Sequence, residues 1–521
     1  MKTLGSYLQG TWQIGPGNEQ TLYDATTEEP LASASTEGFD FKAALRFGRE
    51  VGGPALRALG FAERGEILAK LAETIGEHRD ELLNLGITNA GNTRSDAKFD
   101  VDGARATIFH YAELCKTLGK ARYFVDGGPV ALGRTSRLSG QHFYFPRRGV
   151  AVHINAFNFP AWGMAEKAAT SIAAGVPFLV KPGTATALLA HRMFELFVES
   201  GAVPKGVAQL VVGRVGDLLD HLETQDLIAF TGSASTAAHL RNHRRVLETA
   251  IPFNVEADSL NVALLGPDVE AGTPTHDLFA ACVTRDMTQK AGQKCTAARR
   301  VFVPKNRLQE TLDILLDRLS QHKLGSPQLE DVTVGPLATA QQRTDVLWGI
   351  EQLGQEAEVI CGGVQRPKLL GVDDHRGYFV APTLLVARQE QNLCRVHTLE
   401  VFGPVATVIP YESEAQLFSQ IERGGGSLVA SVFSDDRVFV GSCIEQLSPY
   451  HGRLCVGSEK VASVFVPPGT VMPQLIHGGP GRAGGGTELG GVRGMQFYMQ
   501  RTAIQSFVGH LEELSTGATQ P

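Results

Sequence analysis

One cysteine of this 521-residue chain stands in a setting that suits a nucleophile. Cys295 ends the polar run Gly292-Gln293-Lys294-Cys295, and Arg299 and Arg300 follow it closely. Nearby positive charge favours the thiolate, which is the reactive form of a cysteine. An isolated cysteine is more often an inert residue of the core, so that interpretation stays open.

A carboxylate earlier in the chain could serve as a general base. Glu256 lies in Phe253-Asn254-Val255-Glu256-Ala257, at the end of an apolar stretch. A buried carboxylate is costly unless it is paired or used, and burial raises its pKa. We therefore predict a raised pKa for Glu256, which suits a general base. A structural ion pair is the alternative.

An amide side chain could complete this chemistry. Asn158 lies in the loop Asn155-Ala156-Phe157-Asn158-Phe159-Pro160, directly after a short apolar run. Its N–H groups could donate to an oxygen that becomes negative during a reaction. The alternative is that Asn158 caps the helix that follows.

Three more motifs suggest a phosphate-bearing ligand. Lys181 follows an apolar run, so its ammonium group could meet ribose hydroxyls or phosphate. Gly232 and Ser233 begin an expected helix, whose free N–H groups and dipole favour a phosphate. Glu400 and Phe402 lie at the start of another expected strand. The plain alternatives are a solvated lysine, an ordinary helix start and a turn with a core phenylalanine.

The elements that must position these residues alternate between strands and helices. Short apolar runs at 150–154, 176–180, 207–212 and 227–230 predict strands, with helical patterns between them. This alternation predicts a parallel, doubly wound sheet, which binds ligands beyond the carboxyl ends of its strands. A second α/β unit is expected from about residue 261 to 465.

These patterns divide the chain into three parts. We predict a dinucleotide-binding domain over 1–136 and 149–260, and a catalytic domain over 261–480. The ranges 137–148 and 481–508 fit neither unit, and we predict that they form a small antiparallel arm. An exposed strand edge is commonly covered by another subunit, so we expect a homodimer or a larger homo-oligomer.

Composition excludes several classes of function. The net charge of −7 argues against a nucleic-acid partner, which requires a basic surface. No apolar run is long enough to span a bilayer, and the N-terminus lacks the apolar core of a signal peptide. The seven cysteines are scattered, without C-x-x-C spacing. We therefore predict no metal site and a reduced, cytoplasmic protein.

In their order and spacing, these motifs resemble the aldehyde dehydrogenase superfamily over nearly the whole chain. The matching segments are Asn158-Phe159-Pro160, Lys181-Pro182, Phe230-Thr231-Gly232-Ser233, Glu256, Gly292-Gln293-Lys294-Cys295 and Glu400-Val401-Phe402-Gly403-Pro404. The resemblance implies an α/β fold with a Rossmann-like cofactor domain, an α/β catalytic domain and an antiparallel oligomerisation arm. It also implies an NAD(P)-dependent oxidation of an aldehyde to a carboxylic acid.

The resemblance implies roles for the three catalytic candidates. Cys295 would attack the aldehyde carbon and later carry a thioester. The Asn158 side chain and the backbone N–H of Cys295 would hold the oxyanion. Glu256 would activate water to hydrolyse the thioester, and could also take the thiol proton.

The resemblance implies cofactor contacts as well. Lys181 and Glu400 would hold ribose hydroxyls, and Ser233, which follows Gly232, would contact the pyrophosphate. Phe402 would line the nicotinamide site. Phe157 would also border the cofactor, at a position where many family members carry tryptophan.

One substitution bears on which cofactor is used. Thr184 stands where NAD-preferring members usually carry a glutamate, which would repel a 2′-phosphate. A neutral hydroxyl can donate to that phosphate, and Arg214 could add a charged contact. We therefore predict NADP in preference to NAD.

The glycine-rich tail carries a narrower resemblance. The stretch from His477 to Gly491 is similar to the dehydrogenase half of the bifunctional ring-opening enzymes of phenylacetate breakdown. A free-standing relative, which uses NADP, acts in aerobic benzoyl-coenzyme A degradation. This resemblance implies a semialdehyde linked to coenzyme A. The alternatives are a flexible tail without a substrate role, an enzyme that transfers the acyl group to coenzyme A, and a non-catalytic relative.

Overall fold

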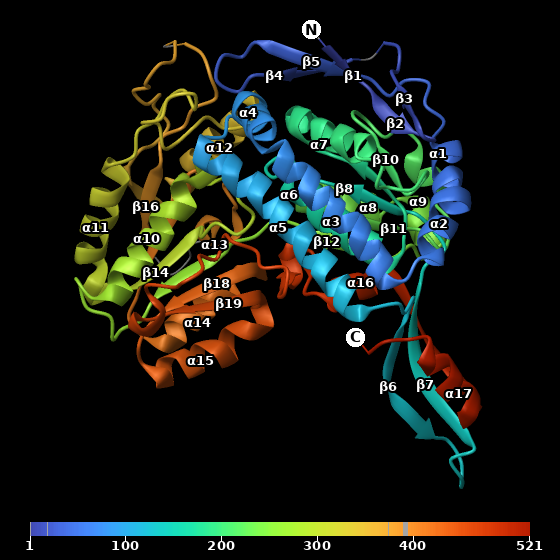
Figure 1. Cartoon of the computed structure of the whole chain (residues 1–521). Coiled ribbons are helices and arrows are strands. Elements are labelled where there is room, and N and C mark those ends of the chain that lie inside the picture. The colour runs from blue at the N-terminus through green and yellow to red at the C-terminus, as the bar shows by residue number, and fades with distance from the viewer. Residues whose placement is uncertain (1, 18, 374, 389–393, 521) are drawn as a thin grey trace.

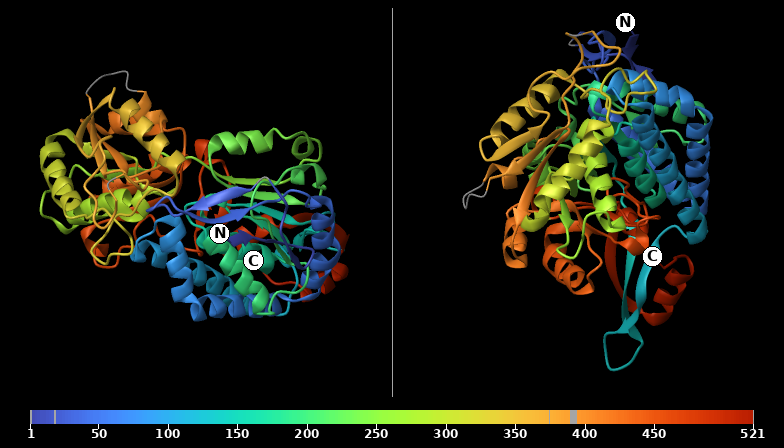
Figure 2. Two further views of the ribbon diagram at one scale, coloured as in Figure 1. Left: turned by 90° about the horizontal axis from the view of Figure 1, so that it is seen from above. Right: turned by 90° about the vertical axis from the view of Figure 1, so that its left-hand side faces the viewer.

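The computed structural model describes residues 2–17, 19–373, 375–388 and 394–520 of the chain. Two α/β lobes lie side by side, and a long hairpin projects from one of them (Figure 1). Seen from above, the lobe formed by the middle of the chain is distinct from the one that contains most of the N-terminal half (Figure 2). The prediction of an α/β fold is confirmed.

The N-terminal lobe contains the predicted parallel sheet. Its strand order is β12-β11-β8-β9-β10-β2-β3, and the strands from β12 to β10 are parallel, whereas β2 and β3 are antiparallel at one edge. The strands are β2 (Ser6–Leu8), β3 (Thr11–Gln13), β8 (Ala151–Ile154), β9 (Phe178–Lys181), β10 (Ala208–Leu210), β11 (Leu227–Thr231) and β12 (Phe253–Glu256).

Helices cover the faces of this sheet. Helix α6 (Trp162–Ala174) links β8 to β9, and α5 (Arg94–Leu118) packs between α6 and α3 (Phe61–Glu77). The apolar positions of α3 recur at helical spacing, so its buried face points into the lobe. Helix α3 ends at His78, where α4 (Arg79–Ala90) begins.

The second lobe is built around another seven-stranded sheet. Its strand order is β15-β16-β17-β14-β13-β18-β19, and only β15 runs antiparallel to its neighbour. The strands are β13 (Val262–Leu265), β14 (Arg300–Pro304), β15 (Ala357–Cys361), β16 (Thr383–Ala387), β17 (Val405–Tyr411), β18 (Ser427–Phe433) and β19 (His451–Gly457). Helices that belong to this lobe include α10 (Pro274–Thr288), α11 (Leu308–Ser320), α12 (Ala340–Leu353), α14 (Glu414–Glu422) and α15 (Arg437–Leu447).

The projecting arm is a three-stranded antiparallel sheet. β7 (Leu138–Pro146) lies between β22 (Met499–Phe507) and β6 (Phe124–Ala131), and α17 (Val508–Thr516) packs against β7 (Figures 1 and 2). The predicted arm ranges contain β7 and β22, and the structure adds β6. The domain bounds themselves stay a prediction.

A short hairpin returns the tail of the chain to the N-terminal lobe. β20 (Ile476–Gly478) and β21 (Thr487–Leu489) pair antiparallel, with His477 opposite Glu488. β21 contacts both β12 and α6, and β20 contacts β19. The glycine-rich tail therefore does not belong entirely to the arm, because this hairpin lies next to the carboxyl end of β12.

Two features concern the chain as a whole. All seven cysteines are free thiols. Within the ranges that the structure describes, no helix combines the length and the apolar character needed to cross a bilayer.

Candidate active site

A cavity of about 710 Å³ opens where the carboxyl ends of the first sheet face the second lobe. All the site residues predicted from the sequence line it, with the exception of Arg214: Phe157, Asn158, Lys181, Thr184, Gly232, Ser233, Glu256, Cys295, Glu400 and Phe402. The sequence reasoning did not identify Trp348, Asp258 and Arg482, which also line the cavity.

A tight backbone segment presents Cys295 to the cavity. The chain leaves α10 through Lys290, Ala291 and Gly292, all of which have positive φ angles. A Cβ atom at Gly292 would lie 2.1 Å from the carbonyl oxygen of Gly403, so glycine is needed for this close approach. Asn261 holds the next turn, because its Nδ2 donates to the carbonyl oxygens of Cys295 at 2.6 Å and of Ala297 at 3.1 Å.

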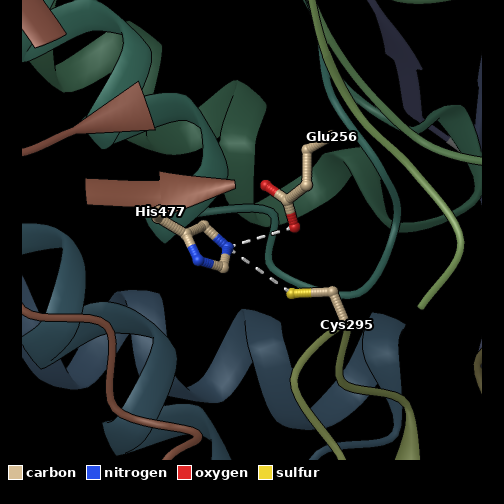
Figure 3. Close-up of side chains that lie close together, drawn as sticks. All are labelled: Glu256, Cys295 and His477. Atoms are coloured by element: carbon tan, nitrogen blue, oxygen red, sulfur yellow. Dashed lines mark hydrogen bonds and ion pairs between the residues drawn. The ribbon is translucent and has the colours of Figure 1, made fainter. Parts of the chain in front are cut away.

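The thiol of Cys295 faces a histidine and a carboxylate (Figure 3). Sγ lies 3.9 Å from Nε2 of His477, and the same nitrogen lies 3.2 Å from Oε1 of Glu256. The three residues come from separate segments: the turn after α10, β20 and β12. His477 was quoted from the sequence only as the start of the glycine-rich tail. No spacing rule linked it to a thiol 182 residues away.

The electrostatics around Cys295 differ from the prediction. Burial raises the pKa of the thiol well above its ordinary value, and the charge of Glu256 raises it further. The side chains of Arg299 and Arg300 donate to backbone carbonyls, among them those of Gly403 and Leu260. Arg299 also interacts electrostatically with Cys295, but burial outweighs this effect. The prediction that this setting favours the thiolate was therefore wrong.

The raised pKa predicted for Glu256 was also wrong. Burial alone would raise the pKa of this carboxyl, but His477 and, to a smaller degree, Lys167 lower it to about 2. Glu256 is therefore ionised although only 2% of it is exposed. Glu256 does form the ion pair considered as an alternative, and its partner, His477, lies against the candidate nucleophile Cys295.

A buried lysine balances a group of carboxylates next to Glu256. The Nζ atom of Lys167 lies 3.0 Å from Glu488 and 3.4 Å from Glu166, and donates to Thr231 at 2.7 Å. Carboxylate oxygens of Glu166, Glu256 and Glu488 lie within 4.8 Å of one another. The ammonium group therefore supplies the positive charge that these acids require in a buried setting.

Asn158 lies at the cysteine turn and does not cap a helix. Its Nδ2 donates to the carbonyl oxygen of Gln293 at 3.0 Å, whereas α6 begins only at Trp162. Asn158 and Cys295 also line a small chamber of about 40 Å³ together with His477. An amide nitrogen carries two hydrogens, so one remains for a substrate oxygen in this chamber. The oxyanion role of Asn158 stays a prediction.

The other end of the cavity suits a dinucleotide. The ammonium group of Lys181 has no side-chain partner among the described residues, and burial lowers its pKa. Burial raises the pKa of Glu400 to about 7, and its Oε2 accepts the N–H of Ser259 at 3.0 Å. The rings of Phe157 and Phe402 meet edge to face at 5.9 Å. An unpaired cation, a carboxylate and an aromatic pair fit the ribose and nicotinamide of such a cofactor.

A helix start lies in the same cavity. Ser233 is the N-cap of α8 (Ala234–Arg241), and its Oγ accepts the N–H of Thr236 at 3.2 Å. The N–H of Ala234 donates to Asp258 at 2.8 Å, so a pyrophosphate here would have a carboxylate close by. Because Arg214 lies outside the cavity lining, its contact with a cofactor stays a prediction.

Comparison with known proteins agrees with this geometry. The profile of the aldehyde dehydrogenase family matches residues 13–504. The chain belongs to the aldehyde dehydrogenase family. It is therefore an NAD(P)-dependent aldehyde dehydrogenase, and the resemblance inferred from the motifs is confirmed.

Individual relatives add detail. This aldehyde dehydrogenase is 44% identical to 3,4-dehydroadipyl-CoA semialdehyde dehydrogenase of Aromatoleum evansii, over 92% of this chain and 93% of that protein. Its fold matches an NADP-dependent enzyme of E. coli with a TM-score of 0.84 and 24% identity, over 97% and 98% of the two chains. An aldehyde dehydrogenase of Bacillus cereus, solved with NAD+, has a TM-score of 0.83 and 23% identity, with 97% of each chain covered.

Proposed function

We propose that this aldehyde dehydrogenase uses NADP to oxidise a semialdehyde whose other end is a coenzyme A thioester, giving the carboxylic acid. The 44% identity to an enzyme named for 3,4-dehydroadipyl-CoA semialdehyde is the observation that carries the substrate assignment. The specific substrate proposed is therefore 3,4-dehydroadipyl-CoA semialdehyde, in the degradation of an aromatic compound.

The proposed reaction uses the chamber around Cys295. Cys295 adds to the aldehyde carbon, while the free N–H of Asn158 and the backbone N–H of Cys295 hold the oxygen that becomes negative. A nicotinamide cofactor held by Lys181, Glu400 and Phe402 would supply the hydride acceptor. Glu256 then takes a proton from the water that hydrolyses the thioester. Its carboxylate is ionised in the structure, so it can accept that proton without a prior deprotonation.

A groove supports the coenzyme A part of the proposal. A cavity of about 1420 Å³ on the other side of the chamber shares Trp162 and Val471 with the chamber lining. Lys98 and Arg285 line this groove, are exposed, and have no ion-pair partner among the described residues. Phe109 also lines it and is 55% exposed. Two free cations and an apolar ring suit the phosphates and the adenine of coenzyme A.

Charge reversal in the groove tests the substrate assignment. We expect Lys98→Glu combined with Arg285→Glu to raise KM for the CoA-linked semialdehyde by about 10- to 100-fold, because two phosphate contacts of about 1–1.5 kcal/mol each are lost. The KM for a short free aldehyde stays unchanged. In the control Lys42→Glu, which changes a surface residue away from the groove, the KM values for both aldehydes stay unchanged. Equal effects on both aldehydes would refute the role of the groove.

The cofactor preference has its own test. Thr184 lines the cofactor cavity, so Thr184→Glu places a carboxylate near the proposed 2′-phosphate. We expect the ratio of kcat/KM for NADP over NAD to fall by about 10-fold or more, whereas Thr184→Gln leaves it within about threefold. An unchanged ratio in Thr184→Glu would refute the assignment.

The product distinguishes hydrolysis from acyl transfer. With added coenzyme A present, we expect the free acid as the product, because Glu256 is available as a base for water. A new thioester would instead show an acylating enzyme, and no cofactor reduction with either class of aldehyde would revive the non-catalytic alternative.

We further propose that the arm pairs two copies of the chain. Leu138 and Phe507 on the arm are 50% and 53% exposed, and a second subunit would cover them. Light scattering of Leu138→Glu combined with Phe507→Glu tests this, with a monomer as the expected result. The seven free thiols support a reducing compartment, and we propose the cytoplasm.

A further inference from the structure

We propose that His477 is the base that takes the thiol proton of Cys295, and that Glu256 is reserved for the water of the second half-reaction. The inference rests on the proposed role of Cys295 as the nucleophile. It makes His477 a catalytic residue that acts in the first half of the reaction.

The position of one nitrogen atom supports this assignment. Nε2 of His477 lies between the reacting groups, 3.9 Å from Sγ of Cys295 and 3.2 Å from Oε1 of Glu256 (Figure 3). Nδ1 is buried without a partner among the described residues, so Nε2 is the nitrogen that can exchange a proton in the chamber. Strand pairing of His477 with Glu488 fixes the backbone that carries the ring.

Glu256 is needed in its ionised form for the second half of the reaction. A thiol proton taken by this carboxylate would leave it protonated when the thioester must be hydrolysed. Nε2 of His477 contacts both the sulfur and the carboxylate, so it can take the proton and leave Glu256 ionised.

The proton balance of the first step is simple. The S–H bond of Cys295 breaks, and its proton goes to Nε2 of His477. The electron pair left on sulfur forms the C–S bond to the aldehyde carbon, and the π pair of the carbonyl moves to its oxygen. The imidazolium that results lies next to the carboxylate of Glu256, which stabilises it. Glu256 stays ionised and can accept the proton of the attacking water in the second step.

Other charged groups surround His477 and Cys295 and affect the proton transfer between them. Glu256 faces His477 from β12, and Glu488 faces it from β21. Glu166 and Lys167 on α6 balance each other near Glu488. Arg453 on β19 lowers the pKa of Cys295 slightly and opposes the effect of burial. The carboxylate of Glu256 lies 3.2 Å from Nε2, next to the place where the proton from sulfur would arrive.

Two measurements on the full-length enzyme test the assignment. The first is the rate at which iodoacetamide alkylates Cys295 without cofactor, measured by mass spectrometry across pH. The second is the burst of reduced cofactor in the first turnover. We expect His477→Phe to slow alkylation near neutral pH by about 10²-fold, to move its inflection to higher pH, and to remove the burst. We expect Glu256→Gln to keep the burst while steady-state turnover falls.

The controls distinguish a folding defect from an error in the assigned nucleophile or in the assigned base. His477→Gln repeats the test with a polar side chain, and His276→Gln is the matched control for a buried histidine outside the site. NADP binding and circular dichroism report whether each variant is folded. If Cys295→Ala keeps the burst and the steady-state turnover of the wild type, the nucleophile assignment fails, and the proposed function fails with it. If both His477 variants keep the wild-type alkylation profile and burst, His477 is not the base.

Discussion

The cofactor end and the thiol end of the same cavity are built in different ways. At the cofactor end, Lys181 is the last residue of β9, and Ser233 follows β11. At the thiol end, Cys295, His477 and Glu256 come from three segments that meet only in the folded chain (Figure 3). Residues that follow parallel strands gather at one sheet edge by topology alone. Residues from distant segments need a complete tertiary structure to meet.

The two ends also differ in how they handle charge. At the cofactor end, Lys181 has no side-chain partner among the described residues, so its ammonium group is available to a ribose hydroxyl. At the thiol end, Lys167, Glu166, Glu488, Glu256 and His477 neutralise one another inside the protein. The cofactor end also contains ion pairs, such as Glu400 with Arg299, so the difference lies in Lys181, which is available to a ligand.

The largest effect is expected from removing the nucleophile. Cys295→Ala should lower kcat by about 10⁴-fold or more, because no other group in the chamber can form the thioester. NADP affinity, measured by fluorescence titration, should stay within about threefold of the wild type. If the affinity for NADP fell in parallel with kcat, the thiol end and the cofactor end would not function independently.

A large loss of stability is expected at the buried lysine. Lys167→Met leaves the carboxylates of Glu166 and Glu488 without their cation, and should lower the free energy of unfolding by about 3–5 kcal/mol. Lys70→Met is the control, because Lys70 forms an exposed pair with Glu73. Denaturant melts measure both variants. Equal, small changes would show that the charge cluster does not depend on Lys167.

Loss of the oxyanion donor should have a smaller effect on rate. Asn158→Ala removes an amide that lines the chamber with Cys295, and we expect kcat to fall by about 10²–10³-fold. Stopped-flow measurement should place the loss in the burst. If only the KM for NADP changed, Asn158 would belong to the cofactor end instead.

The smallest effect is expected from pH at the cofactor end. Burial raises the pKa of Glu400 to about 7, and only its carboxylate can accept two ribose hydroxyls. Below pH 7 the carboxyl becomes protonated, so the KM for NADP should rise by up to about tenfold per pH unit. Glu400→Gln should show a raised KM that no longer depends on pH in this range. A wild-type KM that stays flat from pH 5 to 8 would contradict the role of Glu400.

The sequence by itself determined the elements and the cofactor end. Short apolar runs and helical patterns between them located the strands β8, β9 and β11, because hydrophobic spacing reflects local geometry. The residues after those strands could be assigned to the cavity for the same reason. The order of the motifs around Cys295 also identified the family, because that order can be read without knowing how the segments meet in the fold.

Only the tertiary structure decided the state of the catalytic groups. The pKa of a buried acid depends on the charges around it, and no local pattern places His477 against Glu256 or turns Arg299 toward the carbonyl of Gly403. For that reason the pKa shift predicted for Glu256 had the wrong direction, and the partner of Cys295 was missed. Contacts between distant segments come from the packing of the whole fold, and these contacts govern where the protons lie.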